Sequence, residues 1–154
     1  MKIAGSSAVI LAAGAAGWGL TRTPTAALAP WGLAGSADYR DPRMRALSYA
    51  ILAPNPHNMQ PWVVDLATPG EATLYCDPDR LLPATDPFSR QIVIGLGCFL
   101  ELLRMAAAEE GLRADITPFP EGEDEQRLDG RPIAHIRFWA GAEAARDPLF
   151  AQVL

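Results

Sequence analysis

The chain has 154 residues, of which 49% are hydrophobic, so it is long enough to form one ordinary domain with a real core. Its formal net charge is −5 at pH 7 and its pI is about 4.9. Because phosphate binding needs a clustered basic surface, this balance excludes nucleic acid as an expected partner. The two cysteines, Cys76 and Cys98, have neither metal-ligand spacing nor a C-x-x-C arrangement, so we expect buried thiols and predict no disulfide and no metal site.

The chain begins with an apolar segment, residues 3–20, which is flanked by Lys2 and Arg22. Its length is close to the roughly 20 residues that span a bilayer, but its many glycines make it weakly hydrophobic. An export signal therefore fits better than a permanent anchor, and the small residues that follow favour cleavage after Ala27. The alternative is an ordinary buried N-terminal helix.

These features divide the chain into three parts. Residues 1–29 are expected to be an export signal or membrane-anchor segment, residues 30–38 a linker, and residues 39–154 the folded domain. The first five residues, M-K-I-A-G, resemble the end of a twin-arginine signal without its arginine pair, which predicts a true start codon upstream. We expect an exported or membrane-associated protein of the periplasm or cell envelope, with membrane association through residues 3–20, and a cytoplasmic protein if this segment is not a signal.

The folded domain is predicted to open with a helix. Residues 21–38 are rich in Pro, Gly, Ala and Ser and show no periodicity, which predicts irregular chain before it. Asp41 and Pro42 then supply an N-cap and a first-turn proline, and the helix is expected to end before Pro54. The apolar residues that fall on one face of this helix are Met44, Leu47, Ile51 and Leu52.

A second helix is predicted over residues 91–108, which are apolar almost all the way around a helix and must therefore be buried on most sides. Asp86 provides its N-cap. Gly111 suits its C-terminus, because glycine accepts the left-handed conformation there. Within the helix, Gly95 and Gly97 permit the close approach of another element.

Four β-prone runs accompany these helices. Residues 62–66 and 72–76 flank a turn and predict a hairpin, and residues 114–119 and 133–139 flank an acidic turn, residues 121–125, that we expect to be a solvated loop. Together the elements predict an α+β fold in which a buried central helix packs against a small, mostly antiparallel sheet.

The last signal is a third cap, Asp147 with Pro148, which opens a short helix over residues 149–154. This segment has no closing glycine, no basic last turn and no polar tail. The pattern is typical of a chain truncated at its C-terminus.

Residues 53–62, with the sequence A-P-N-P-H-N-M-Q-P-W, form what we call the amide loop. Its carboxamides, on Asn55, Asn58 and Gln60, both donate and accept hydrogen bonds, as the alternating carbonyl and N–H groups of a flavin pyrimidine ring require. The prolines restrain the loop: Pro56 should hold Asn55 extended, and Pro61 should hold Gln60 extended. The alternative is a helix-to-strand connection whose amides bond to their own backbone.

The amide loop is similar to the nitroreductase family pattern A-P-S-x-x-N-x-Q-P-W. A second block, residues 77–112, resembles the exported, Acg-like subgroup of that family. The resemblance implies an α+β sandwich in which two related halves surround FMN; ordinary members form homodimers, while the subgroup carries both halves in one longer chain. By carry-over, Asn58 and Gln60 should contact the flavin, Asn55 stands where the family has serine, and His57 should stabilise the turn.

The family's phosphate-binding motif, Arg-Arg-Ser-x-Arg, is missing before the amide loop, where Arg43 and Arg45 have the wrong context. In the subgroup an equivalent arginine-rich motif follows a segment like residues 147–154. The resemblance therefore implies that this chain is the N-terminal half of a nitroreductase-like domain, and that a missing second half-domain completes the site. Since charge-assisted contacts to phosphate are strong, the fragment should bind FMN weakly and be inactive alone.

For the whole protein, the resemblance implies an FMN-dependent oxidoreductase that passes electrons from NAD(P)H through the flavin to a nitroaromatic or quinone-type acceptor. No residue is a convincing general acid, base or nucleophile, so we assign no catalytic residue. Two alternatives are a non-catalytic flavin-binding or flavin-sequestering protein and a cofactor-free envelope domain in which the amide loop is only structural.

Overall fold

A computed structural model of the chain describes residues 13–19, 21–23, 25–124, 127–141 and 143–154. The described residues fall into two units, which divide between Gly32 and Leu33. Of the proposed export segment, residues 1–29, residues 1–12, 20 and 24 lie outside the described residues.

The described part of the N-terminal unit consists of helical segments with a bend at residues 22–23. Residues 13–19 are helical, and helix α2 covers Thr25–Leu33. The expectation of irregular chain is therefore wrong at α2, although Pro30 lies inside this helix. The high helix propensity of its alanines and leucines outweighs the proline and glycine that suggested a linker. No residue of α2 is buried.

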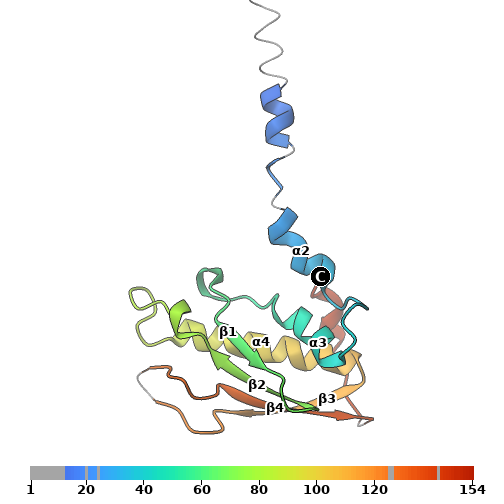
Figure 1. The fold of residues 1–154 in the computed structure, drawn as a ribbon, viewed down its shortest axis with the longest axis vertical. Helices are drawn as coiled ribbons and strands as arrows, with labels where there is room; N and C mark the ends of the chain where they lie inside the picture. Colours follow the sequence, from blue (N-terminus) through green and yellow to red (C-terminus); the bar gives the residue numbers. More distant parts are fainter. Residues whose placement is uncertain (1–12, 20, 24, 125–126, 142) are drawn as a thin grey trace, which may run out of the picture. The chain divides into compact units, whose positions relative to one another are not determined.

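The second unit contains a four-stranded antiparallel sheet with the strand order β1-β2-β4-β3. The strands are β1 Trp62–Asp65, β2 Glu71–Cys76, β3 Leu112–Pro118 and β4 Ala134–Ala140. Strands β1 and β2 form the predicted hairpin, with Trp62 opposite Cys76. Helix α4 crosses one face of the sheet, and α3 packs against α4 (Figure 1). The predicted α+β fold with a central helix is confirmed.

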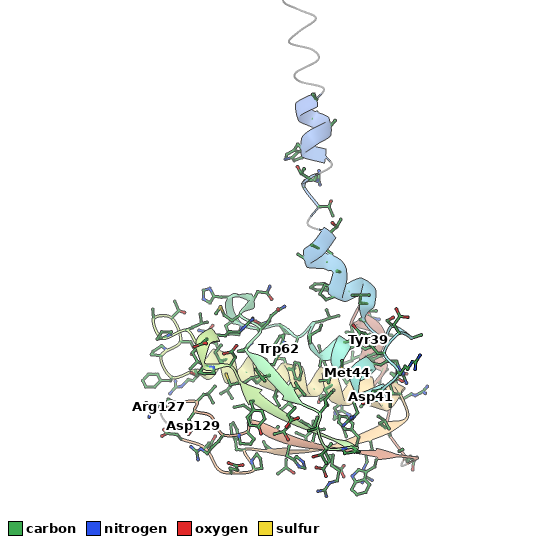
Figure 2. The ribbon with its side chains drawn as sticks, in the orientation of Figure 1. Tyr39, Asp41, Met44, Trp62, Arg127 and Asp129 are labelled. Atoms are coloured by element: carbon green, nitrogen blue, oxygen red, sulfur yellow. The ribbon has the colours of Figure 1, made fainter. Side chains whose placement is uncertain are left out.

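Helix α3, Pro42–Ala50, begins at the predicted cap, where an Asp41 carboxylate oxygen accepts from the Arg43 N–H at 2.9 Å. The predicted buried face is partly wrong, because Met44 is 39% exposed (Figure 2). The buried residues are Ala46, Leu47, Ser48 and Ala50. Small side chains on this stripe let α3 approach α4 closely, which leaves the larger Met44 on the outside.

Helix α4, Arg90–Glu109, starts three residues after the predicted cap region and has Ser89 at its N-cap. Ser89 is left-handed (φ 53°) and makes no side-chain cap bond. Asp86 nevertheless serves the first turn, because its buried Oδ2 accepts from the Ile92 N–H at 3.0 Å. The predicted end is confirmed, since Gly111 has φ +71°.

One side of α4 supplies the centre of the core. Its Phe99 is 1% exposed and lies against the Trp62 ring with 5.1 Å between ring centroids. From the sheet, Leu74 and Ile136 complete this core, at 0% and 1% exposure. Among the described residues α4 is also long and apolar enough to cross a bilayer, but half of its span is buried. A core helix meets the same criteria of length and composition, and its packing here accounts for them.

The C-terminal cap and the acidic turn largely agree with the predictions from the sequence. Asp147 accepts from the Leu149 N–H at 2.9 Å and so caps a short 3-10 helix, η3, Pro148–Gln152. The cap is as predicted, although the helix is 3-10 in type. Residues 121–124 are exposed, as expected for a solvated turn; residue 125 lies outside the described part.

Candidate functional site

The amide loop contains a 3-10 turn, η1, Pro56–Asn58, and three non-glycine residues with positive φ. These are His57 (51°), Asn58 (52°) and Gln60 (49°). A left-handed residue of this kind costs about 1–2 kcal/mol, least for Asn and His. The pair His57-Asn58 therefore suits the turn through its backbone, which agrees with a turn-stabilising role for His57.

Two prolines of the loop act differently from one another. Asn55 is extended before Pro56 (φ −149°, ψ 153°), as predicted. Gln60 is not extended before Pro61, so that prediction is wrong. Its N–H donates to Asn55 Oδ1 at 2.7 Å, and this local bond closes the loop in the left-handed form.

The three predicted site residues fall into two groups. The Asn55 amide is used inside the loop, because Oδ1 accepts from Gln60 and Nδ2 donates to the Ala53 carbonyl at 3.1 Å. For Asn55 the structure thus matches the alternative in which an amide bonds to its own backbone. Asn58 and Gln60 are exposed, and their side-chain amides make no hydrogen bond with the described part of the chain.

The loop is attached to the domain at both ends. At the beginning it lies on α4, where Gly95 allows contact: a Cβ at this position would lie 3.2 Å from Asn55 Cβ and 3.3 Å from Pro56 Cδ. At the far end the Pro61 carbonyl accepts from the Asp77 N–H at 2.7 Å. The exposed amides of the loop lie between these two attachments.

Arg80 provides a third attachment. Its Nη1 donates to the Met59 carbonyl at 2.8 Å and lies 3.5 Å from the Gln60 carbonyl. Arg80 closes the short helix η2, Pro78–Arg80, and its Nε lies 3.2 Å from Asp77 Oδ2. The two sequence blocks that resemble the nitroreductase family are therefore in direct contact.

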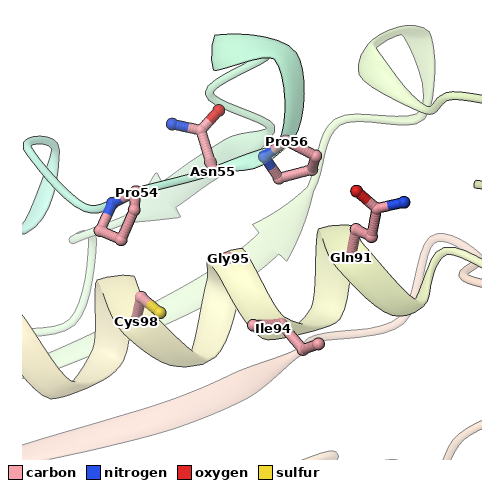
Figure 3. A pocket seen from close by; sticks show the side chains of 7 residues that line it. All are labelled: Pro54, Asn55, Pro56, Gln91, Ile94, Gly95 and Cys98. Carbon is pink, nitrogen blue, oxygen red and sulfur yellow. The ribbon is translucent and has the colours of Figure 1, made fainter.

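A pocket of about 300 Å³ opens between the start of the amide loop and α4 (Figure 3). This volume is at the lower end of small-molecule sites, which span about 300–1,000 Å³. The pocket is mostly apolar, and its lining residues are Pro54, Asn55, Pro56, Gln91, Ile94, Gly95 and Cys98. Gln91 is exposed, and its amide makes no hydrogen bond with the described residues.

Of the α4 residues of this pocket, Gly95 is expected from the sequence as a point of close approach, whereas Gln91, Ile94 and Cys98 are not among the predicted site residues. The signal was present: Gln91, Ile94 and Cys98 share a helix face with Gly95, because residues three and four apart are neighbours on a helix. A larger cavity, about 540 Å³, shares Ile94 with the pocket but includes no residue of the amide loop.

Arg43 and Arg45 are engaged by the protein itself. The Arg43 Nη1 donates to the carbonyls of Thr68 (2.8 Å) and Glu71 (2.7 Å), and so holds the β1–β2 turn. Hydrogen bonds from Arg43 also lower the pKa of Asp41. Arg45 pairs with Glu110 at 2.6 Å. Both guanidinium groups therefore stabilise the fold, in agreement with the wrong sequence context for a phosphate motif.

The two thiols differ in environment. Cys76 is buried, and burial, with a smaller effect of the Asp77 charge, raises its pKa to about 11. Cys98 is half-buried and lines the pocket. Among the described residues, no cluster of His, Cys, Asp and Glu has the arrangement of a metal site.

Iodoacetamide is expected to modify Cys98 at least about tenfold faster than Cys76 at pH 7, since a thiol of pKa about 11 is roughly one part in 10⁴ thiolate there. Mass spectrometry of digested samples over time measures both rates. C98S should remove the fast phase and C76S should keep it. Equal rates in the native protein would contradict the assigned environments.

No protein-family profile matches the chain. The chain is similar to "Putative NAD(P)H nitroreductase acg" of Mycobacterium tuberculosis, with 37% identity over 83 residues, which are 54% of this chain and 25% of that protein. A second M. tuberculosis protein named "Putative NAD(P)H nitroreductase" is 34% identical over 82 residues, 53% of this chain and 24% of that protein.

An uncharacterized protein of the same organism is 35% identical over 97 residues, 59% of this chain and 28% of its own length. The matches thus span about a quarter of the length of each relative. Over about half of its residues, this chain is similar to proteins that are named as NAD(P)H nitroreductases.

Proposed function

We propose that this chain forms one wall of an FMN site in a nitroreductase-like oxidoreductase of the exported, Acg-like type. The observation that carries the proposal is the amide loop. Its start lines an open, mostly apolar pocket through Pro54, Asn55 and Pro56. Its second half exposes Asn58 and Gln60, whose carboxamides make no hydrogen bond with the described residues and are not part of the pocket lining. The similarity of about half the chain to two proteins named NAD(P)H nitroreductases supports it.

The residues present fit the ring of FMN better than its phosphate. Carboxamides offer both a donor and an acceptor, which matches the alternating groups of the pyrimidine ring, and Pro54, Pro56 and Ile94 supply apolar walls for an aromatic system. Arg43 and Arg45 are already bonded within the fold. A second half-domain would therefore supply the phosphate anchor and the other wall.

When bound, FMN would supply the redox chemistry, accepting a hydride from NAD(P)H and passing electrons to a nitroaromatic or quinone-type acceptor. The part of this chain is to bind and orient. Asn58 and Gln60 would hydrogen-bond the ring edge, Asn55 would brace the loop, and Ile94 would exclude water from one side of the pocket. No acid or base from this loop is required.

The test is the double variant N58A/Q60A in the full-length protein. Two lost hydrogen bonds of about 0.5–1.5 kcal/mol each predict roughly 5-fold to 150-fold weaker FMN binding. Flavin fluorescence titration measures the affinity, and thermal unfolding shows that the fold is kept. Q152A, a matched exposed amide on η3, should bind FMN like the wild type. Equal flavin retention in the double variant would reject the assignment.

The bonding of Asn55 also fits an alternative in which the amide loop is only structural. Its amide serves the loop's own backbone, as a purely structural loop requires. A colourless full-length protein would favour a cofactor-free envelope domain, and flavin binding without NAD(P)H oxidation would favour a sequestering protein. We further propose that residues 1–29 direct export or anchor the chain at a membrane, which fractionation of cells expressing the chain with and without them would test.

A further inference from the structure

The left-handed conformation of Gln60 is held by contacts both within the amide loop and from outside it. Gln60 has a positive φ although glutamine, unlike histidine and asparagine, is not a residue type that favours this region. The turn is exposed at His57, Asn58 and Gln60, so core packing does not fix it. The bond from the Gln60 N–H to Asn55 Oδ1 is the loop's own contribution, and contacts from outside the loop add to it.

Arg80 makes those contacts. Its guanidinium reaches the carbonyls of Met59 and Gln60, which belong to the peptide bonds before and after the left-handed residue Gln60. The charged donor strengthens these bonds relative to neutral ones. Asp77 holds the guanidinium from the opposite side at 3.2 Å, and the Asp77 N–H fixes the next carbonyl, that of Pro61. The Asp77–Arg80 turn thus binds three consecutive carbonyls of the loop.

We propose that Arg80 is a positioning residue of the ligand site: it holds the Met59 and Gln60 carbonyls and so fixes the direction in which Asn58 and Gln60 present their amides. The identity of the ligand rests on the proposed function, whereas the role of Arg80 in the loop geometry does not. Arg80 acts through the backbone, so a substitution should affect the order of the loop much more than the stability of the domain.

The experiment compares R80Q and R80K with a matched control, R113Q. Arg113 is equally exposed, at 50% against 49% for Arg80, and pairs with Asp115 two residues away in β3. Hydrogen exchange of the ligand-free 154-residue chain reports the Gln60 N–H, which bonds to Asn55 Oδ1 only when the loop is closed. R80Q should raise its exchange rate about tenfold, R80K should restore part of the protection, and R113Q should leave it unchanged.

FMN titration of the full-length variants gives the second readout, with R80Q expected to bind about tenfold more weakly at an unchanged Tm. Unchanged exchange at Gln60 in R80Q would overturn the positioning role, whatever the flavin affinity. Faster exchange at Gln60 together with a lower Tm in R80Q would overturn it too. In that case the loss of domain stability would account for the loss of protection, and Arg80 would be a general stabilising contact. Faster exchange together with no FMN binding by the wild-type protein would leave Arg80 assigned to the loop and reject the flavin function.

Discussion

Replacing Phe99 with alanine is expected to lower the free energy of unfolding by about 3–5 kcal/mol, the usual cost of deleting a fully buried aromatic side chain. Phe99 is 1% exposed at the centre of α4 and lies against the Trp62 ring. Since small domains have a total stability of about 5–15 kcal/mol, this one change removes a large part of it. Urea unfolding followed by circular dichroism measures the loss.

The same helix offers a control. Ile94 is 67% exposed, so I94A removes little buried area and should change the stability by no more than about 0.5 kcal/mol. Because the Phe99 ring lies against the Trp62 ring, F99A should also shift the tryptophan fluorescence of the folded protein, whereas I94A should not. Similar losses in the two variants would show that α4 does not pack on the sheet through its Phe99 face.

Much of the fold is predictable from the sequence because caps, turns and helix ends are determined by residues that are close together in the chain. The caps at Asp41 and Asp147 make the bonds that their positions predict, and Gly111 takes the left-handed conformation that ends α4. The hairpin forms where two β-prone runs flank a turn. Each of these features depends on residues within a few positions of one another.

Of the three errors in the fold, one arises where a tertiary contact decides, and the other two, at the start of α4 and at α2, are local in origin. Met44 has the right spacing for the buried face of α3, but close packing on α4 selects small side chains instead. At the start of α4, Asp86 acts across an intervening turn, so the helix begins at Arg90. In α2, the propensity of individual residues prevails over proline and glycine.

The candidate site shows the same division. The residues of the amide loop are identifiable from the sequence, but the conformation of Gln60 is not, because the contacts that fix it come from Asn55 and from Arg80, which is distant in sequence. The α4 wall of the pocket depends on how the loop lies across Gly95. Long-range docking of this kind leaves only a weak trace in the sequence, here a glycine within an otherwise apolar helix.

Replacing Gly95 with leucine is therefore expected to separate the amide loop from α4. Even a Cβ at this position would lie 3.2–3.3 Å from Asn55 and Pro56, and a leucine side chain must displace both. Overpacking of this kind costs about 1–3 kcal/mol, which outweighs the gain of about 1 kcal/mol from removing glycine from a helix. Urea unfolding measures the net loss, and hydrogen exchange at the Gln60 N–H should increase because the Asn55 contact is disturbed.

Gly97 is the matched control, since it lies on the same helix but nothing is within 4 Å of a Cβ there. G97A should stabilise the protein by about 0.5–1 kcal/mol, through helix propensity alone. G95A has the same propensity gain, but Asn55 and Pro56 must move by a few tenths of an ångström to admit its Cβ. The G95A variant should therefore be less stable than G97A. If G95L and G97L instead had the same stability and the same exchange at Gln60, the amide loop would not be seated on Gly95, and the pocket wall would have to be assigned elsewhere.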